Sequence, residues 1–240
     1  MKDIETIYGI HASISALNNV ERKIISFKCT KEVFNKIKDK ILNERLPKFK
    51  LVKRKELDHE LKINHHQGIL VRATTINNKN FSIDEIISQK NNLVLILDGL
   101  TDPQNVGAII RSAYLFGIKV IFYSENNSFD INSNLIKASS GSYEKVKLIK
   151  VVNLNNLVKT LKSNDYWIIG LDSKSNSLIE SIPKNIYKAI IIGSENKGIK
   201  KLLRENCDFL VKIPMIENDR EIDSLNVSNA ASIIFYEMRN

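Results

Sequence analysis

The chain has 240 residues, of which 43% are hydrophobic and 26% are charged, proportions that are ordinary for a globular protein able to bury a real core. No apolar run approaches the roughly 18–20 residues needed to cross a bilayer. The first residues also lack the basic start and apolar stretch of a secretion signal. We therefore expect a cytoplasmic protein that has no membrane partner.

The two cysteines, Cys29 and Cys207, lie far apart and have no histidines at metal-ligand spacing. We expect reduced thiols of no special function. His65 and His66 have no cysteine or carboxylate at ligand spacing nearby, and we interpret them as part of a strand end. The sequence therefore predicts no metal site.

The net charge of +9 is unevenly distributed. Residues 1–80 hold 17 Lys and Arg against 9 Asp and Glu, whereas residues 81–240 hold 19 against 18. Nearly all of the excess positive charge thus lies in the first third of the chain. Such a block suits a polyanionic partner, most commonly nucleic acid, although a solvated lysine-rich surface would look the same.

Residues 1–72 read as a small mixed α/β domain. Helical spacing of apolar residues predicts a helix at 10–17. The other predicted elements are a strand at 23–27, a helix at 31–46, and short strands at 49–52 and 68–71. The segment 73–88 contains a polar, non-periodic stretch and is predicted to be a linker.

From residue 89 to the end, strand and helix patterns alternate. Asp102 followed by Pro103 is a strong helix start, and Gly117 is a good stop. Strands are predicted at 93–97, 120–123, 146–149, 167–170, 189–192 and 209–213, and further helices at 154–161, 199–206 and 225–238. Helical crossovers between strands predict a mainly parallel sheet.

Three short polar groups follow apolar runs in this second region. The first contains Asn105 and Arg111, although an exposed helical arginine is commonly only solvated. The second, 193–198, follows a buried strand where open α/β sheets bind ligands, but a plain turn with a solvated Glu195 would also fit.

The third polar group follows the last predicted strand. Ile213-Pro214-Met215 ends that strand, because proline cannot continue a central ladder. Ser224 and Asn226 then lie at the start of the final helix, where they are either helix caps or groups that hold an oxygen of a ligand.

In order and spacing, these groups resemble the motifs of the SpoU-type (TrmH-like) ribose 2′-O-methyltransferases of the SPOUT superfamily. The resemblance covers about residues 92–240 and is most specific at 102–111 and 224–228. It implies a deeply knotted α/β fold, S-adenosylmethionine bound in the knot, and a homodimer with its sites at the interface. The runs 8–12 and 66–69 are similar to the start and end of the ribosomal-protein-like RNA-binding domain of the rRNA-modifying members.

The resemblance also implies roles for single residues. It assigns the catalytic cluster to Asn105, Arg111, Glu195, Ser224 and Asn226, and cofactor contacts to Gly193, Ile213, Met215 and Leu225. Because an arginine cannot accept a proton, we interpret Arg111 as a clamp on the target phosphate. The acidic segment 216–223 is about three residues longer than the family pattern.

Together these observations predict an enzyme with a small α/β RNA-binding domain followed by a knotted, mainly parallel SPOUT domain. The expected reaction is 2′-O-methylation of rRNA with S-adenosylmethionine, on a guanosine of 23S rRNA by resemblance to the two-domain members. A tRNA 2′-O-methyltransferase and a non-catalytic RNA-binding ribosome-assembly factor are the alternatives.

Overall fold

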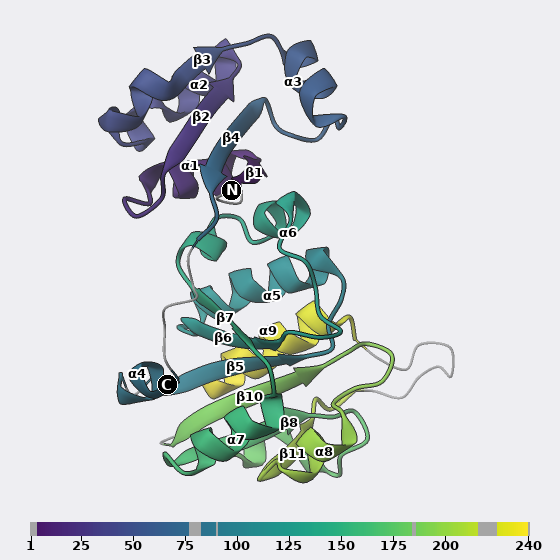
Figure 1. The fold of residues 1–240 in the computed structure, drawn as a ribbon. Coiled ribbons are helices and arrows are strands. Elements are labelled where there is room, and N and C mark those ends of the chain that lie inside the picture. The colour runs from purple at the N-terminus through teal and green to yellow at the C-terminus, as the bar shows by residue number, and fades with distance from the viewer. Residues whose placement is uncertain (1–3, 77–82, 90, 184–185, 216–224, 240) are drawn as a thin grey trace. The chain divides into compact units, whose positions relative to one another are not determined.

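The computed structural model describes residues 4–76, 83–89, 91–183, 186–215 and 225–239. Its contacts divide the chain into two compact units, drawn in Figure 1. The first unit comprises Met1–Asn77 together with Ile131–Lys145, and the second comprises Asn78–Asp130 and Val146–Asn240. A segment from the middle of the chain therefore packs with the N-terminal residues. Within the described ranges, no helix is both long and apolar enough to cross a bilayer.

The first unit is built on a four-stranded sheet in the order β1-β4-β2-β3. Strand β4 runs antiparallel to β1 and β2, while β3 runs parallel to β2. The strands are β1 (Ile4–Tyr8), β2 (Ile24–Cys29), β3 (Phe49–Leu51) and β4 (Ile69–Thr74). The helices are α1 (Ile10–Asn18), α2 (Lys31–Ile37), α3 (Arg54–Leu61) and α6 (Ser133–Ala138), with 3₁₀ turns at Lys38–Lys40, Asn43–Lys48 and Ser142–Glu144.

The helix predicted at 31–46 is too long: α2 ends at Ile37 and gives way to two 3₁₀ turns. The cause is a side chain from another element. The amide of Asn18 donates to the carbonyl of Lys40 at 2.7 Å and accepts from the backbone N–H of Leu42 at 3.0 Å. These bonds satisfy backbone groups that a continuing helix would use, so the chain turns instead.

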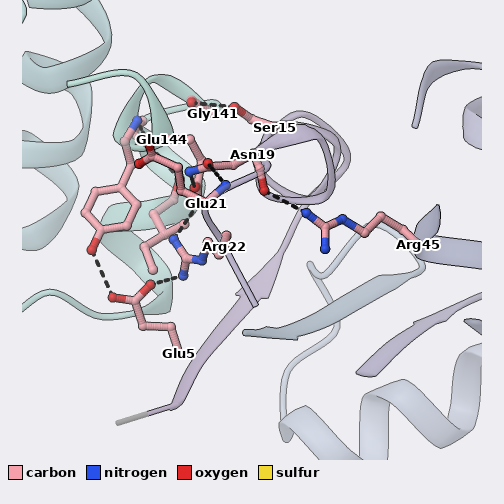
Figure 2. A network of polar contacts seen from close by, with 11 residues as sticks. Glu5, Ser15, Asn19, Glu21, Arg22, Arg45, Gly141 and Glu144 are labelled. Carbon is pink, nitrogen blue, oxygen red and sulfur yellow. Dashed lines mark hydrogen bonds and ion pairs between the residues drawn. The ribbon is translucent and has the colours of Figure 1, made fainter. Parts of the chain in front are cut away.

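A buried polar network joins the segment 131–145 to the rest of the first unit (Figure 2). The guanidinium of Arg22 lies between Glu5 and Glu144, with its Nη1 2.6 Å from Glu144 Oε1. Tyr143 donates its hydroxyl hydrogen to Glu5 at 2.9 Å, and Asn19 donates to Glu144 at 2.8 Å. We call these five residues the arginine network. Buried charges need partners, and here each terminal guanidinium nitrogen of Arg22 faces a carboxylate, while its buried Nε has no hydrogen-bond partner among the described residues.

The second unit has a seven-stranded sheet in the order β7-β6-β5-β10-β8-β11-β9, and every strand pair described runs parallel. This confirms the predicted α/β class with a mainly parallel sheet. The strands are β5 (Leu93–Asp98), β6 (Val120–Ser124), β7 (Lys147–Val151), β8 (Tyr166–Leu171), β9 (Ser177–Leu178), β10 (Tyr187–Gly193) and β11 (Phe209–Lys212). All six residues of β5 are buried, as expected for a central strand.

Helices cover both faces of this sheet, as Figure 1 shows. On one face, α5 packs against α9; on the other, α4, α7 and α8 bury a continuous apolar cluster against the strands. The helices are α4 (Ile83–Ser88), α5 (Pro103–Leu115), α7 (Leu154–Lys162), α8 (Lys201–Glu205) and α9 (Val227–Met238). The predicted start of α5 is confirmed: Asp102 is its N-cap and accepts from the N–H of Gln104 at 2.9 Å.

Candidate active site at the ends of the parallel strands

The candidate site lies where two neighbouring central strands end. Strands β5 and β10 are paired in register up to Asp98 and Gly193, their last residues. The chain leaves β5 towards α5 and leaves β10 through the loop 194–198. The carboxyl edge of a parallel sheet is where α/β proteins bind ligands, so the two predicted polar groups meet at a suitable place.

Asn105 connects three segments that are remote in the sequence. Its Nδ2 donates to Glu195 Oε1 at 2.8 Å, and its Oδ1 accepts from Asn226 Nδ2 at 3.1 Å. Glu195 is 90 positions and Asn226 is 121 positions away in the chain. The structure thus brings together three of the five predicted catalytic residues, which we call the amide cluster.

Asn226 is both a helix cap and a member of the amide cluster. Its Oδ1 accepts from the backbone N–H of Ser228 at 2.8 Å and from the Ser228 hydroxyl at 2.6 Å. Those bonds determine which end of the amide faces Asn105. The two readings of this residue from the sequence are therefore compatible. Ser224, the fourth predicted catalytic residue, lies outside the described residues, as does the whole acidic segment 216–223.

The loop that carries Glu195 is held tightly. Ser194 and Gly198 exchange two backbone hydrogen bonds, with N···O distances of 3.2 and 2.8 Å. A Cβ on Gly193 would lie 2.1 Å from the carbonyl carbon of Gly198, so only glycine fits there. Gly193 is thus needed for packing of the loop, whether or not it also contacts a cofactor.

Asp98 fixes the far end of this loop and was not singled out from the sequence. Its side chain is buried; one oxygen accepts from the backbone N–H of Lys200 at 2.8 Å, and the other lies 3.0 Å from Lys200 Nζ. The available signal was a carboxylate closing a wholly apolar strand and followed by Gly99. A charge at that position needs a partner, and partners beyond a strand end are usually loop backbone groups.

Three of the predicted cofactor residues are apolar side chains that are not fully buried. Ile213 is half-buried after β11, while Met215 and Leu225 are apolar yet 45% and 39% exposed. Apolar side chains exposed at a sheet's binding edge, beside a few directed polar groups, suit a planar ligand. These residues therefore fit S-adenosylmethionine, whose adenine needs apolar cover and whose polar atoms can bond loop backbone.

Arg111 is not part of the amide cluster. It is exposed and makes no hydrogen bond or ion pair with the residues that the structure describes. On α5 it stands three and four positions before Tyr114 and Leu115, so all three lie on one helix face. Both of those neighbours are exposed, Leu115 by 68%.

Comparison with known proteins gives the family. The model of the SpoU rRNA methylase family matches residues 92–236. The 23S rRNA (guanosine-2′-O-)-methyltransferase RlmB of Haemophilus influenzae is 33% identical over 98% of this chain and 96% of its own length. RlmB of Coxiella burnetii is 32% identical over 100% and 96%.

A solved structure supports the fold. The SpoU methyltransferase AviRb of Streptomyces viridochromogenes, in complex with AdoMet, superposes with a TM-score of 0.76 at 18% identity, covering 97% of this chain and 88% of that one. The likeness extends over both units, and the resemblance predicted from the three polar groups is confirmed. The chain belongs to the SpoU family of RNA methyltransferases.

Proposed function

We propose that this protein transfers a methyl group from S-adenosylmethionine to the ribose 2′-oxygen of a guanosine in 23S rRNA. The observation that carries the proposal is the amide cluster, Asn105–Glu195–Asn226, at the carboxyl ends of β5 and β10. The relatives named for this reaction match nearly the whole chain, which supports the rRNA substrate.

The reaction forms a bond between the 2′-oxygen and the methyl carbon, breaks the bond between that carbon and sulfur, and releases the hydroxyl proton. The bound cofactor supplies a methyl group on a positively charged sulfur, so its leaving group needs no protonation. The protein has to align the ribose and draw the hydrogen from its 2′-hydroxyl. Gly193, Ile213, Met215 and Leu225 would hold the cofactor, largely through backbone groups and apolar cover.

The amide cluster has hydrogen-bonding capacity left for the ribose. Each asparagine has a second side-chain N–H, and Glu195 has a second carboxylate oxygen. None of these groups bonds a described residue. We assign that oxygen to accept the 2′-hydroxyl hydrogen, and the amide N–H groups to bind neighbouring oxygens. Ser224, two positions before Asn226, would add a hydroxyl to the same set.

Arg111 would bind the target phosphate, and a second copy of the chain would bring it to the site. Besides Tyr114 and Leu115 on α5, α9 exposes Ile233 and Tyr236 by 37% and 51%. Helices α5 and α9 pack together, so these side chains support a shared apolar face that pairs with its own copy. Arg111 lies on the α5 part of that face.

Three further parts of the proposal concern the fold and the setting. The chain leaves β11, two strands away from β10, and returns to pack α9 on α5, a path that supports the proposed trefoil knot. The positive charge of residues 1–80 supports the predicted RNA-binding domain at 1–72, before the methyltransferase domain predicted at 89–240. Of the predicted linker 73–88, residues 83–88 form α4 and pack with the second unit. An rRNA substrate would place the protein in the cytoplasm.

Methyl transfer from labelled S-adenosylmethionine to unmodified 23S rRNA and tRNA transcripts, followed by mapping of the modified ribose, tests the proposal. We expect a single labelled guanosine in 23S rRNA. Label in tRNA alone would contradict the proposed rRNA substrate. Failure of S-adenosylmethionine to bind in calorimetry would contradict the proposed enzymatic activity. The variant Asn105→Ala, which removes the centre of the amide cluster, should lower methyl transfer. Its matched control is Asn156→Ala, on the exposed side of α7 and remote from β5 and β10 in sequence.

A further inference from the structure

One face of the sheet in the first unit is only partly covered. Thr6 of β1 is paired with Arg72 of β4, and Tyr8 is paired with Leu70. Because residues two apart in a strand share a face, all four side chains lie on the same face of the sheet. Helix α3 covers the part around Leu70, which packs against Leu57. The part around Thr6 and Arg72 forms one side of a pocket of about 370 Å³.

The pocket has an apolar wall. Leu61, at the end of α3, and Ile63, just beyond it, are its aliphatic lining residues, and the ring of Tyr8 also lines it. Tyr8 is 3% exposed, and its hydroxyl donates to Asn134 at 2.5 Å, so its ring is held in place. The volume lies within the range of about 300–1,000 Å³ typical of small-ligand sites.

The remaining lining is polar and charged. Thr6 and Ser133 are hydroxyl residues, and Glu60 and Arg72 bring opposite charges. Glu60 accepts from Arg72 at 3.0 Å through one oxygen and from Lys28 at 2.8 Å through the other. Two cations on one carboxylate leave a net positive charge beside the pocket. The side chain of Arg72 is 45% exposed, and the planar face of its guanidinium can take a further contact.

We infer that this pocket binds an unpaired nucleotide of the RNA substrate. The base lies between the guanidinium plane of Arg72 and the aliphatic wall of Leu61 and Ile63, a way in which single-stranded bases are commonly held. The net charge beside the pocket attracts the adjoining phosphate. Only the nature of the ligand, RNA, rests on the proposed function.

The carboxylate of Glu60 adds a preference among bases. Each oxygen already accepts one hydrogen bond but can accept another. A carboxylate recognises the exocyclic amino groups that adenine, guanine and cytosine carry and uracil lacks. The pocket should therefore disfavour uridine. Glu60→Gln, which adds an amide donor, should reduce the preference for oligo(A) over oligo(U).

Two variants test the pocket in the full-length protein. Arg72→Ala removes the stacking plane and one cation, and Thr6→Trp fills the space with a residue that strands accept well. We expect each to weaken binding of an unmodified 23S rRNA transcript about tenfold at fixed salt. Arg72→Ala should also lower the salt dependence of the binding constant by about one unit of slope, which Thr6→Trp should not do.

Lys36→Ala is the matched control, because Lys36 is an exposed cation in a surface ion pair with Glu32 of the same unit. Because Lys36 also belongs to the positively charged residues 1–80, this variant measures the general loss of attraction to RNA, and it should weaken binding clearly less than either pocket variant does. Thermal melting of each variant checks that it is folded. In the wild type, photocrosslinking of a short single-stranded RNA containing 6-thioguanosine should label residues 60–72. Wild-type affinity in both pocket variants, or crosslinks confined to other segments, would overturn the inference.

The pocket and the proposed function fail separately. If the wild type transfers no methyl group but Arg72→Ala and Thr6→Trp still weaken RNA binding, the pocket stands and the proposed enzyme does not. If methylation of 23S rRNA proceeds and the pocket variants bind RNA normally, the reverse holds.

Discussion

The protein contains two polar clusters assembled from remote segments, and they differ in what they leave unsatisfied. The arginine network is buried and contains three charged side chains that bond one another (Figure 2). The amide cluster is open to solvent and keeps unused N–H groups and a carboxylate oxygen. Buried polar groups whose charges pair with one another stabilise or specify a fold, whereas exposed groups held in place with spare hydrogen-bonding capacity can bind a ligand.

The largest expected effect comes from removing the centre of the arginine network. Arg22→Met leaves Glu5 and Glu144 as buried carboxylates with no cation between them. Losing one partner of a buried ion pair costs about 3–5 kcal/mol of unfolding free energy. Urea titration at neutral pH should show this loss, and acidification should reduce it because Glu144, whose pKa burial raises, can then be protonated. A change below about 1 kcal/mol would show that the network contributes little to stability.

The amide cluster should respond in the opposite way. Asn105→Ala removes the residue that joins Glu195 to Asn226, while the side chain is partly exposed and buries little surface. We expect kcat for methyl transfer to fall about 100-fold, as for loss of one preorganised donor. The melting temperature should stay near that of Asn156→Ala. A large loss of stability with a proportionate loss of activity would place this cluster with the arginine network.

Much of the second unit could be predicted from the sequence because its signals are local. The wholly apolar β5, the cap and proline at Asp102-Pro103, and the polar groups after β5 and β10 need only neighbouring residues to be recognised. The convergence of Asn105, Glu195 and Asn226 followed from parallel strands ending at one edge, together with the resemblance to a family. Arg111 could not be placed with the amide cluster, because it makes no hydrogen bond or ion pair with the described residues of its own chain.

The first unit was harder to predict because its structure depends on distant side chains. Asn18 ends α2 early, and the short segment around α6 belongs to this unit through Glu144 and Tyr143 rather than through any pattern of its own. A deletion of residues 1–77 would leave Glu144 and Tyr143 without Arg22 and Glu5, their partners in the arginine network. Point substitutions are therefore the sharper probe of RNA binding by this unit.

Asn226 tests whether one residue can serve both as a cap and as a site group. Asn226→Ala should cost about 1 kcal/mol of stability through loss of the helix cap and should also lower kcat. Asn226→Asp keeps the oxygen that accepts from Ser228 but loses the N–H that faces Asn105. Stability should then be retained while kcat still falls. Asn153→Ala, which removes the N-cap of α7, is the control: it should lose similar stability with normal kcat.

The smallest effect concerns the protonation of the arginine network. Burial raises the pKa of Glu144 above its ordinary value, although Arg22 and the amide of Asn19 act in the other direction. A raised pKa in the folded state gives a stabilising contribution that is complete below the ordinary glutamate pKa and is lost as pH rises through the raised value. Glu144→Gln, which resembles the protonated acid, does not titrate.

The unfolding free energy of Glu144→Gln should therefore gain on that of the wild type as pH rises from about 4 towards neutrality, measured by urea titration at each pH. Glu32→Gln is the control, because Glu32 is exposed and its pKa is lowered by the hydrogen bond and charge of Lys36. The unfolding free energy of Glu32→Gln should fall relative to that of the wild type over the same pH range. Parallel curves for Glu144→Gln and the wild type would mean that the carboxylate is as well solvated by Arg22 and Asn19 as by water. The arginine network would then differ from the amide cluster in burial but not in the energetic cost of its charge.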